Sequence, residues 1–214
     1  MAELLLIRHG QASFGEEDYD KLSATGRLQA KALGDFLRKT GWSPDRFITG
    51  TLNRQRQTLE DMGFNQEVEE HAGFNEYDFD DLLQAHHGNA IVDRKLFGRK
   101  ELFGILRQTV FDWQENKISG AAETWDDFSK RTAQALDFAT TTNARRVVVI
   151  SSGGVIGQLG ADTLRAPVQM MMELNLQIKN SAMTKFVFSR DRRMLQEFNA
   201  TPHCDFDPSL LTYA

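Results

Sequence analysis

The sequence predicts an α/β fold, a three-layer α/β/α sandwich built around a mainly parallel central sheet. Two continuous apolar runs, at residues 4–7 and 147–150, are typical of strands that are buried on both faces. Between these runs, apolar residues recur at the three- to four-residue spacing of helices. Strands that alternate with helices in this way form sheets that are mainly parallel and covered by helices on both sides.

The other elements follow in order along the chain. Residues 25–40 form an expected helix with Leu28, Leu33 and Leu37 on its inward face, and Asn53 is expected to cap the next helix. The further expected helices cover residues 101–116, 125–140 and 155–164. The further expected strands cover residues 46–49, 68–70, 174–178, 184–189 and 194–198.

The chain has 214 residues, a length that suits one domain. We expect a single domain over residues 1–214, with an inserted helical excursion at about 77–120, because no proline- or serine-rich linker flanks that segment. The excursion mixes aromatic, glycine and charged residues, so its elements are the hardest to predict. We expect substrate specificity to lie there.

The bulk properties favour a soluble, cytoplasmic protein. The net charge is −5, and an acidic balance disfavours binding to nucleic acid or to an anionic membrane. Cys204 is the only cysteine, so no intramolecular disulfide can form, as is usual in a reducing compartment. No signal segment is visible, and no stretch approaches the roughly 20 apolar residues of a membrane helix. The oligomeric state is not evident from the sequence.

Polar residues directly follow three of the expected strands. Arg8 and His9 come after the first strand, Arg54 lies shortly after the second, and Ser152 and Gly153 follow the valine-rich strand. Ligands of open α/β sheets bind beyond the carboxyl ends of the strands. These residues are therefore expected to share one pocket.

The residue types in this pocket suit a phosphate group. Arg8 and Arg54 have permanently charged, planar guanidinium groups that match phosphate oxygens. Helix N-termini after Asn53 and Gly153 would add backbone N–H donors. His9 can attack phosphorus as a nucleophile, and a carboxylic acid could protonate the leaving oxygen.

Six segments in a fixed order strengthen this interpretation. They are Leu6-Ile7-Arg8-His9-Gly10, Leu22-Ser23 with Gly26 and Gln29-Ala30, Leu52-Asn53-Arg54 with Gln57-Thr58, Phe74-Asn75-Glu76-Tyr77-Asp78-Phe79, residues 147–156, and Phe198-Asn199-Ala200-Thr201-Pro202-His203. Together they resemble the histidine phosphatase superfamily, the phosphoglycerate-mutase-like proteins. The resemblance covers nearly the whole chain and is weakest over about residues 80–120.

The resemblance implies a phosphatase that needs no metal and no cofactor. His9 would accept the phosphoryl group as phosphohistidine, and Glu76 would be the general acid for the leaving group and then the base for water. The implied phosphate-binding residues are Arg8, Arg54, Ser152 and Gly153. The implied substrate is a small phosphorylated molecule or a phosphoprotein. A phosphatase is favoured over a mutase, since no further basic group for a second substrate phosphate is evident.

Two positions depart from the family pattern. Gly50 stands where the pattern has a serine, and Ser152 stands where it has a second histidine. A hydroxyl is a neutral and shorter donor than an imidazolium. A charge-assisted hydrogen bond contributes about 1.5–3 kcal/mol, and a preorganised transition-state donor about 2.7–4 kcal/mol. We therefore expect activity about 10- to 1000-fold below that of a relative with both histidines. The alternative is a catalytically weak or inactive phosphate-binding module on the same fold.

Two further interpretations stay open at this point. Ser152, Asp191 and His203 follow the chain order of a serine-hydrolase triad, although the residue two before the serine is not the glycine of a nucleophile elbow. His86 and His87 form a pair that is either a surface feature or a group leaning over the pocket. Neither interpretation matches the ordered motifs as the phosphatase does.

Overall fold

The computed structural model describes residues 1–13, 20–88, 99–190 and 192–213. Within these residues, one six-stranded mixed sheet is covered by helices, which confirms the predicted α/β fold class. The strands are β1 (Ala2–Arg8), β2 (Arg46–Thr49), β3 (Val68–Glu70), β4 (Arg146–Ser151), β5 (Met183–Phe188) and β6 (Arg193–Ala200). The helices are α1 (Ala24–Lys39), α2 (Asn53–Asp61), α3 (Phe79–His87), α4 (Arg99–Gln114), α5 (Trp125–Thr140), α6 (Gly153–Thr163) and α7 (Met170–Asn175).

The strand order is β3-β2-β4-β1-β5-β6, so β1 and β4 lie at the centre of the sheet. They are parallel neighbours, as their continuous apolar runs predict, and Arg8 pairs in register with Ser151. β2 runs parallel to β4, whereas β5 and β6 add antiparallel strands on the side of β1. The carboxyl ends of β1, β2 and β4 therefore meet at one edge, where the predicted pocket residues follow them.

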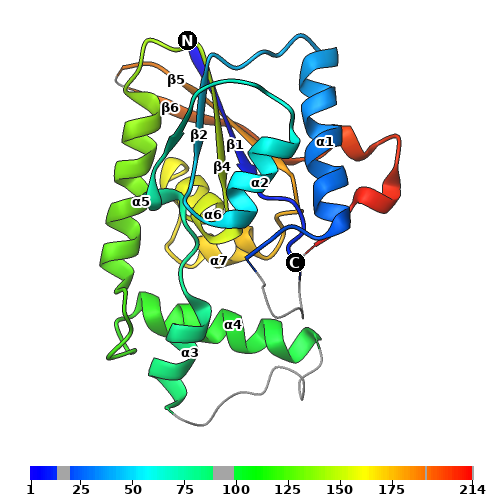
Figure 1. Ribbon diagram of the computed structural model, residues 1–214. Coiled ribbons are helices and arrows are strands. Elements are labelled where there is room, and N and C mark those ends of the chain that lie inside the picture. Colours follow the sequence, from blue (N-terminus) through cyan, green and yellow to red (C-terminus); the bar gives the residue numbers. More distant parts are fainter. Residues whose placement is uncertain (14–19, 89–98, 191, 214) are drawn as a thin grey trace.

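Helices lie on both sides of the sheet (Figure 1), and alternate residues of the central strands belong to two separate hydrophobic clusters. Leu4 and Leu6 of β1 pack with residues of α5, α6 and α7. Leu5 and Ile7 pack with residues of α1 and α2 on the opposite face. Because neither face of β1 meets water, apolar residues are favoured at consecutive positions, which produces the run seen in the sequence.

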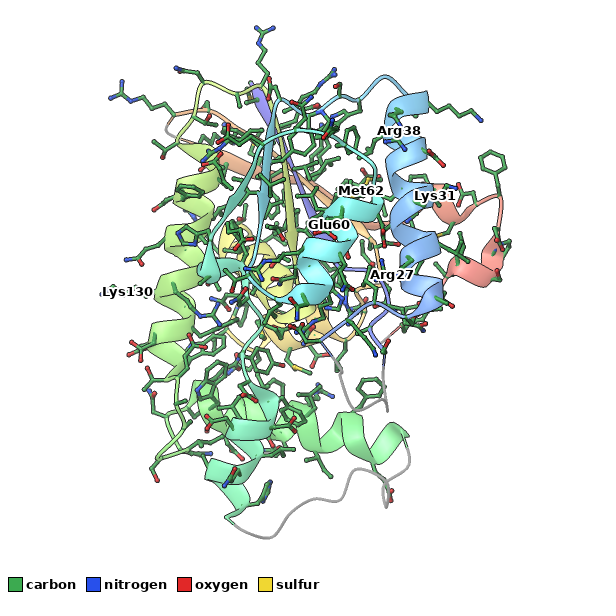
Figure 2. All side chains as sticks on the ribbon, viewed as in Figure 1. Arg27, Lys31, Arg38, Glu60, Met62 and Lys130 are labelled. Carbon is green, nitrogen blue, oxygen red and sulfur yellow. The ribbon has the colours of Figure 1, made fainter. Side chains whose placement is uncertain are left out.

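Helix α1 packs on α2 at a position where only glycine fits. A Cβ on Gly34 would lie 2.0 Å from the backbone oxygen of Met62, the residue that follows α2. Beside this contact, Arg38 of α1 donates from Nη1 to the same Met62 oxygen at 2.7 Å. Figure 2 labels Arg38 and Met62 near one another, at the adjacent ends of the two helices. The close approach and the hydrogen bond fix α2, and thereby the site residues on it, against α1.

Replacing Gly34 by alanine is expected to lower the free energy of unfolding by about 1–3 kcal/mol, because the new methyl group overpacks this contact. Gly104 is a matched control, since it lies within α4 and a Cβ there would meet no atom within 4 Å. Gly104→Ala is expected to raise the free energy of unfolding by up to about 1 kcal/mol, because alanine is the better helix former. Urea unfolding measures both changes, and a loss of equal size in both variants would contradict the packing argument.

Two local predictions are wrong. Leu28 is 57% exposed, and the buried stripe of α1 runs instead through Ala30 and Leu33, which are three residues apart as helical packing requires. Residues 174–178 are not a strand but the end of α7 and a turn. Their alternating apolar residues imitate a strand, whereas the burial of Met171 and the residue after it stabilises a short helix.

Helices α3 and α4 lie beyond the end of the sheet toward which β1 runs (Figure 1). Helix α4 is close to the helix expected at residues 101–116, whereas α3 has no counterpart among the predicted elements. Trp113 of α4 packs on Tyr77 and on Phe128 of α5, with ring centroids 5.4 and 5.3 Å apart. The organisation as one domain over residues 1–214 with an excursion at about 77–120 stays a prediction. None of the helices in the described ranges is long and apolar enough to cross a membrane.

Candidate active site

The residues that follow β1 are fixed by backbone hydrogen bonds at the carboxyl edge of the sheet. The His9 N–H donates to Ser151 O at the end of β4 (2.9 Å), and the Ser181 N–H donates to His9 O (3.2 Å). The Gly10 N–H donates to Thr58 Oγ1 of α2 (3.0 Å). The position of His9 is therefore set by β4, by α2 and by the segment before β5.

His9 is 4% exposed, and its two ring nitrogens have different partners. Nδ1 lies 2.7 Å from Gly10 O, and because a carbonyl oxygen only accepts, Nδ1 is the nitrogen that bears the hydrogen. Nε2 accepts from Arg54 Nε at 3.1 Å and therefore has the lone pair. Burial, together with the charges of Arg54 and Arg8, lowers the pKa of His9 well below its usual range. His9 is thus a neutral imidazole with a nucleophilic Nε2.

Arg54 reaches His9 from the first turn of α2, and Asp20 holds it there. The Asp20 carboxylate accepts from the Asn53 N–H at 2.9 Å and pairs with Nη1 of Arg54 at 2.7 Å. The prediction that Asn53 caps α2 is wrong, because Leu52 occupies the capping position and has no side-chain acceptor. The carboxylate of Asp20 supplies the acceptor instead and also interacts favourably with the positive end of the helix dipole.

Arg8 ends β1 and is 8% exposed. Its Nη1 donates to Ile178 O in the segment before β5. A Cβ on Gly153 would lie 3.7 Å from Cζ of Arg8 and 2.3 Å from Oδ1 of Asn175. The guanidinium group therefore lies against the N-terminus of α6, and the absence of a side chain at Gly153 allows the neighbouring groups to approach so closely.

Glu76 follows the short 3-10 helix η1 (Ala72–Phe74) and also reaches the N-terminus of α6. Its Oε2 accepts from the Gly154 N–H at 2.9 Å, while its Oε1 is buried and has no hydrogen-bond partner among the described residues. Burial raises the pKa of the Glu76 carboxyl above its usual range, although the Gly154 N–H and the charges of Arg54 and Arg8 act in the opposite direction. The neutral form, which has a proton to donate, is thereby favoured.

Ser152 follows β4 and is fully buried. Its Oγ accepts a hydrogen bond from Gln55 Nε2 at 3.0 Å. His203 is hydrogen-bonded to a different serine, Ser181, whose Oγ lies 2.8 Å from Nε2, and burial lowers the pKa of His203 to about 4. In the described part of the chain, Ser152 and His203 are thus not hydrogen-bonded as a serine-hydrolase triad requires. Asp191 lies outside the described residues.

The His86–His87 pair lies on α3, where Nε2 of His86 is 3.1 Å from Oδ2 of Asp112 on α4. The two imidazole rings are 4.4 Å apart. Both histidines line a cavity of about 450 Å³ between α3 and α4, together with Ile105 and Gln108. The described residues that line this cavity include none of the predicted site residues.

The structure adds three residues that the motifs did not single out. Asp20 holds Arg54, Gln55 holds Ser152, and Asn175 lies over Gly153. The sequence has no signal for these contacts, because each joins segments that are far apart in the chain. Two fixed guanidinium groups, a neutral nucleophilic nitrogen and a helix N-terminus lie together at one edge of the sheet, which supports the phosphate-binding interpretation. Such a set of donors can bind a tetrahedral anion and stabilise charge that develops on it.

Arg8→Ala is expected to weaken the binding of inorganic phosphate about tenfold or more, because a hydrogen bond to a charged group contributes about 1.5–3 kcal/mol. Arg56→Ala is the matched control, since Arg56 also lies on α2 but pairs with Glu70 at 2.6 Å on the protein surface. Calorimetric titration with phosphate measures both affinities once thermal unfolding has shown that both variants fold. Equal losses would contradict the placement of Arg8 in the pocket.

Known proteins share this fold. Phosphoserine phosphatase from Entamoeba histolytica, solved with 3-phosphoglyceric acid, is 23% identical, with a TM-score of 0.69 over 95% of this chain and 99% of that chain. A mycobacterial glucosyl-3-phosphoglycerate phosphatase is 21% identical, with a TM-score of 0.68 over 94% and 100%. The α-ribazole phosphatase from Shigella flexneri is 20% identical, with a TM-score of 0.67 over 93% and 96%.

Sequence comparison assigns the family. Phosphoglycerate mutase from Candida albicans is 36% identical over 64 residues, which are 27% of this chain and 26% of the mutase. The matching region thus spans only about a quarter of the length of such curated relatives. The model of the histidine phosphatase superfamily (branch 1), in contrast, matches residues 4–201. Because that match covers nearly the whole sequence, the chain belongs to the histidine phosphatase superfamily.

Proposed function

We propose that the protein is a phosphatase that hydrolyses a phosphate monoester through a phosphohistidine at His9. The observation that carries the proposal is the state of His9, a buried neutral ring whose Nδ1–H is fixed on Gly10 O and whose Nε2 lone pair is directed at Arg54 Nε. Membership of the family and the phosphatases among its structural relatives support the reaction class.

In the proposed reaction, Arg8, Arg54 and the Gly153 backbone at the start of α6 bind the phosphoryl oxygens. The Nε2 lone pair of His9 forms a bond to phosphorus while the ester P–O bond breaks, and the leaving oxygen takes the proton of Glu76. Water then attacks phosphorus and gives a proton to the Glu76 carboxylate. The N–P bond breaks, phosphate leaves, and His9 is again a neutral imidazole.

The substrate of this reaction is a small phosphorylated molecule or a phosphoprotein in the cytoplasm. The structural relatives are named for phosphoserine, glucosyl-3-phosphoglycerate and α-ribazole, which favours small phosphorylated molecules. A phosphatase is preferred to a mutase because, among the residues that the structure describes, no basic group for a second phosphate is identified at the proposed site.

A phosphate-binding module is the second candidate, and Ser152 is the observation that favours it. The Ser152 hydroxyl is fully buried and accepts a hydrogen bond from Gln55, so this position offers no charged donor to a transferred phosphoryl group. The remaining donors, on Arg8, Arg54 and the start of α6, would bind phosphate without fast turnover.

A trapping experiment separates these candidates. The protein is mixed rapidly with radiolabelled phosphoserine, quenched in base, and searched by mass spectrometry for phosphohistidine. The phosphatase is expected to carry the label on His9, and His9→Ala is expected to carry none. Binding of phosphate with no label on any residue would favour the binding module, whereas labelling of Ser152 by a fluorophosphonate would favour a serine hydrolase.

A further inference from the structure

The side chain of Gln55 contacts three segments that contribute residues to the proposed site. It lies on α2 next to Arg54 and is fully buried. Its Nε2 donates to Phe74 O at 2.9 Å and to Ser152 Oγ at 3.0 Å, and its Oε1 accepts from the Leu52 N–H at 3.3 Å. One amide therefore links α2, the segment before Glu76 and the turn between β4 and α6.

The hydrogen bond from Gln55 to Phe74 O affects the position of Glu76, which lies only two residues further along the chain. Phe74 O accepts a second hydrogen bond from Ser151 Oγ at 2.8 Å. The carbonyl is thus held from α2 by Gln55 and from β4 by Ser151. Removing Gln55 would leave a single side-chain donor at this point.

The carbonyls on either side of Phe74 are held by a residue of another helix, α5. Arg131 of α5 donates from Nη1 to Gly73 O at 3.1 Å and to Asn75 O at 2.7 Å. The Arg131 guanidinium is itself oriented by an ion pair with Glu123. Three consecutive carbonyls before Glu76 are therefore fixed by side chains, and Gln55 is the contact from the helix that carries Arg54.

Gly50 and Ser152 both lie against the buried amide of Gln55. A Cβ on Gly50 would lie 2.0 Å from Gln55 Oε1, and Ser152 on the other side has no exposed surface. Gly50 and Ser152 are the two positions at which the sequence departs from the family pattern. Both departures therefore meet at the same side chain, which needs a small residue at each position.

We propose that Gln55 is a positioning residue of this active site, which holds the Glu76 loop and the Ser152 turn against the helix that carries Arg54. The inference rests on the proposed phosphatase function. Gln55 acts through Glu76 and not on the substrate: without its bond to Phe74 O, the carboxyl group shifts relative to the leaving oxygen. Displacements of about 1 Å reduce such steps by up to about 100-fold.

A positioning role predicts a dependence on the leaving group. An alkyl phosphate such as phosphoserine has a basic leaving oxygen and needs the proton of Glu76. An aryl phosphate such as 2,4-dinitrophenyl phosphate has a weakly basic leaving oxygen and departs without it. A general disturbance of the fold would lower the rate of phosphorylation by both substrates, whereas a misplaced Glu76 lowers only the rate of phosphorylation by the alkyl phosphate.

The test compares Gln55→Met with Gln158→Met. Methionine keeps most of the side-chain volume but donates no hydrogen bond. Gln158 is another buried glutamine, on α6, whose Nε2 donates to Asp162 at 2.9 Å. Gln55→Met is expected to lower the single-turnover rate of His9 phosphorylation by phosphoserine about tenfold or more, and to change the rate of phosphorylation by dinitrophenyl phosphate less than about twofold. Gln158→Met is expected to change neither rate.

The same substitution in a Glu76→Gln background supplies the decisive comparison. If Gln55 acts through Glu76, Gln55→Met adds little to the loss that Glu76→Gln already causes. Equal losses on both substrates, or losses that multiply in the double variant, would overturn the proposal. If Gln55→Met does not fold, Ser151→Ala removes the other donor to Phe74 O and must give the same substrate-dependent loss.

A failure of the proposed function can be told from a failure of this inference. If the wild-type protein turns over neither substrate, the phosphatase assignment fails, but the position of Glu76 can still be measured by an NMR titration of its carboxyl group. Gln55→Met is expected to move the raised pKa of Glu76 toward its usual value, because a released loop lets water reach the carboxyl group. An unchanged pKa would overturn the role of Gln55.

Discussion

Alanine in place of His9 is expected to lower the rate of phosphate-ester hydrolysis about 1000-fold or more, because His9 is the group that forms the covalent intermediate in the proposed reaction. The loss should be similar for phosphoserine and for dinitrophenyl phosphate, since both reactions begin with attack by Nε2. Single-turnover measurements with both substrates test this. Retention of more than about a tenth of the activity would mean that the nucleophile lies elsewhere.

The same variant should fold and should still bind inorganic phosphate. Arg8 and Arg54 remain, and the Arg54 Nε–H that donates to His9 Nε2 becomes available to the anion.

The stability of the His9→Ala variant should also depend less on pH than that of the wild-type protein. In the folded protein, burial holds the pKa of His9 below 6.5. As the pH falls below 6.5, His9 therefore becomes protonated in the unfolded wild-type chain before it does so in the folded protein, and the free energy of unfolding decreases. Between pH 7.5 and about pH 5, the Tm of His9→Ala should therefore decrease less than the Tm of the wild-type protein.

The central part of the fold follows from short-range patterns in the sequence. The runs at residues 4–7 and 147–150 are strands because each side chain is buried on one face or the other, and the structure pairs them as parallel neighbours. The helix at Trp125–Thr140 was equally clear from its periodic apolar residues. Helix α3, in contrast, was missed although Phe79, Leu82 and Leu83 follow helical spacing and Asp78 caps its N-terminus. The pattern covers only about two helical turns within a segment of mixed composition, so it is weak evidence by itself.

Contacts between distant segments set the details of the candidate site, and these were beyond sequence reasoning. The ion pair of Asp20 with Arg54 joins two segments whose proximity follows only from the fold.

The effect of replacing Ser152 by histidine also depends on such a contact. The family motif alone suggests that the substitution would add a charged donor. The structure puts the buried amide of Gln55 3.0 Å from Ser152 Oγ, so a larger imidazole at this fully buried position is expected to overpack the contact with Gln55.

Replacing Glu76 by glutamine is expected to lower kcat on phosphoserine about 100- to 10,000-fold, because the amide cannot give a proton to the leaving oxygen. The loss on dinitrophenyl phosphate should be much smaller in the phosphorylation step. Glutamine keeps the shape of the side chain, and its carbonyl oxygen can still accept from the Gly154 N–H that now bonds Oε2 of Glu76. Equal losses on both substrates would assign Glu76 a structural role instead.

The pH profile provides a second and independent measurement. On phosphoserine, the wild-type rate should fall as the pH rises through the raised pKa of Glu76, because the proton donor is then lost. At acidic pH the rate should fall only where His9 becomes protonated, well below pH 6.5. Glu76→Gln should lack the alkaline decline, while the acidic decline remains because His9 is unchanged.

The stability of Glu76→Gln should change in the opposite direction to its activity. Because the folded-state pKa of Glu76 lies above 4.5, the unfolded chain ionises first, and wild-type stability is lost as the pH rises from 4.5 through that folded-state pKa. Glutamine does not ionise, so the variant should have the higher Tm at pH 8, and the difference should disappear below pH 4.5. A Tm difference that does not vary with pH would mean that burial does not raise the folded-state pKa of Glu76.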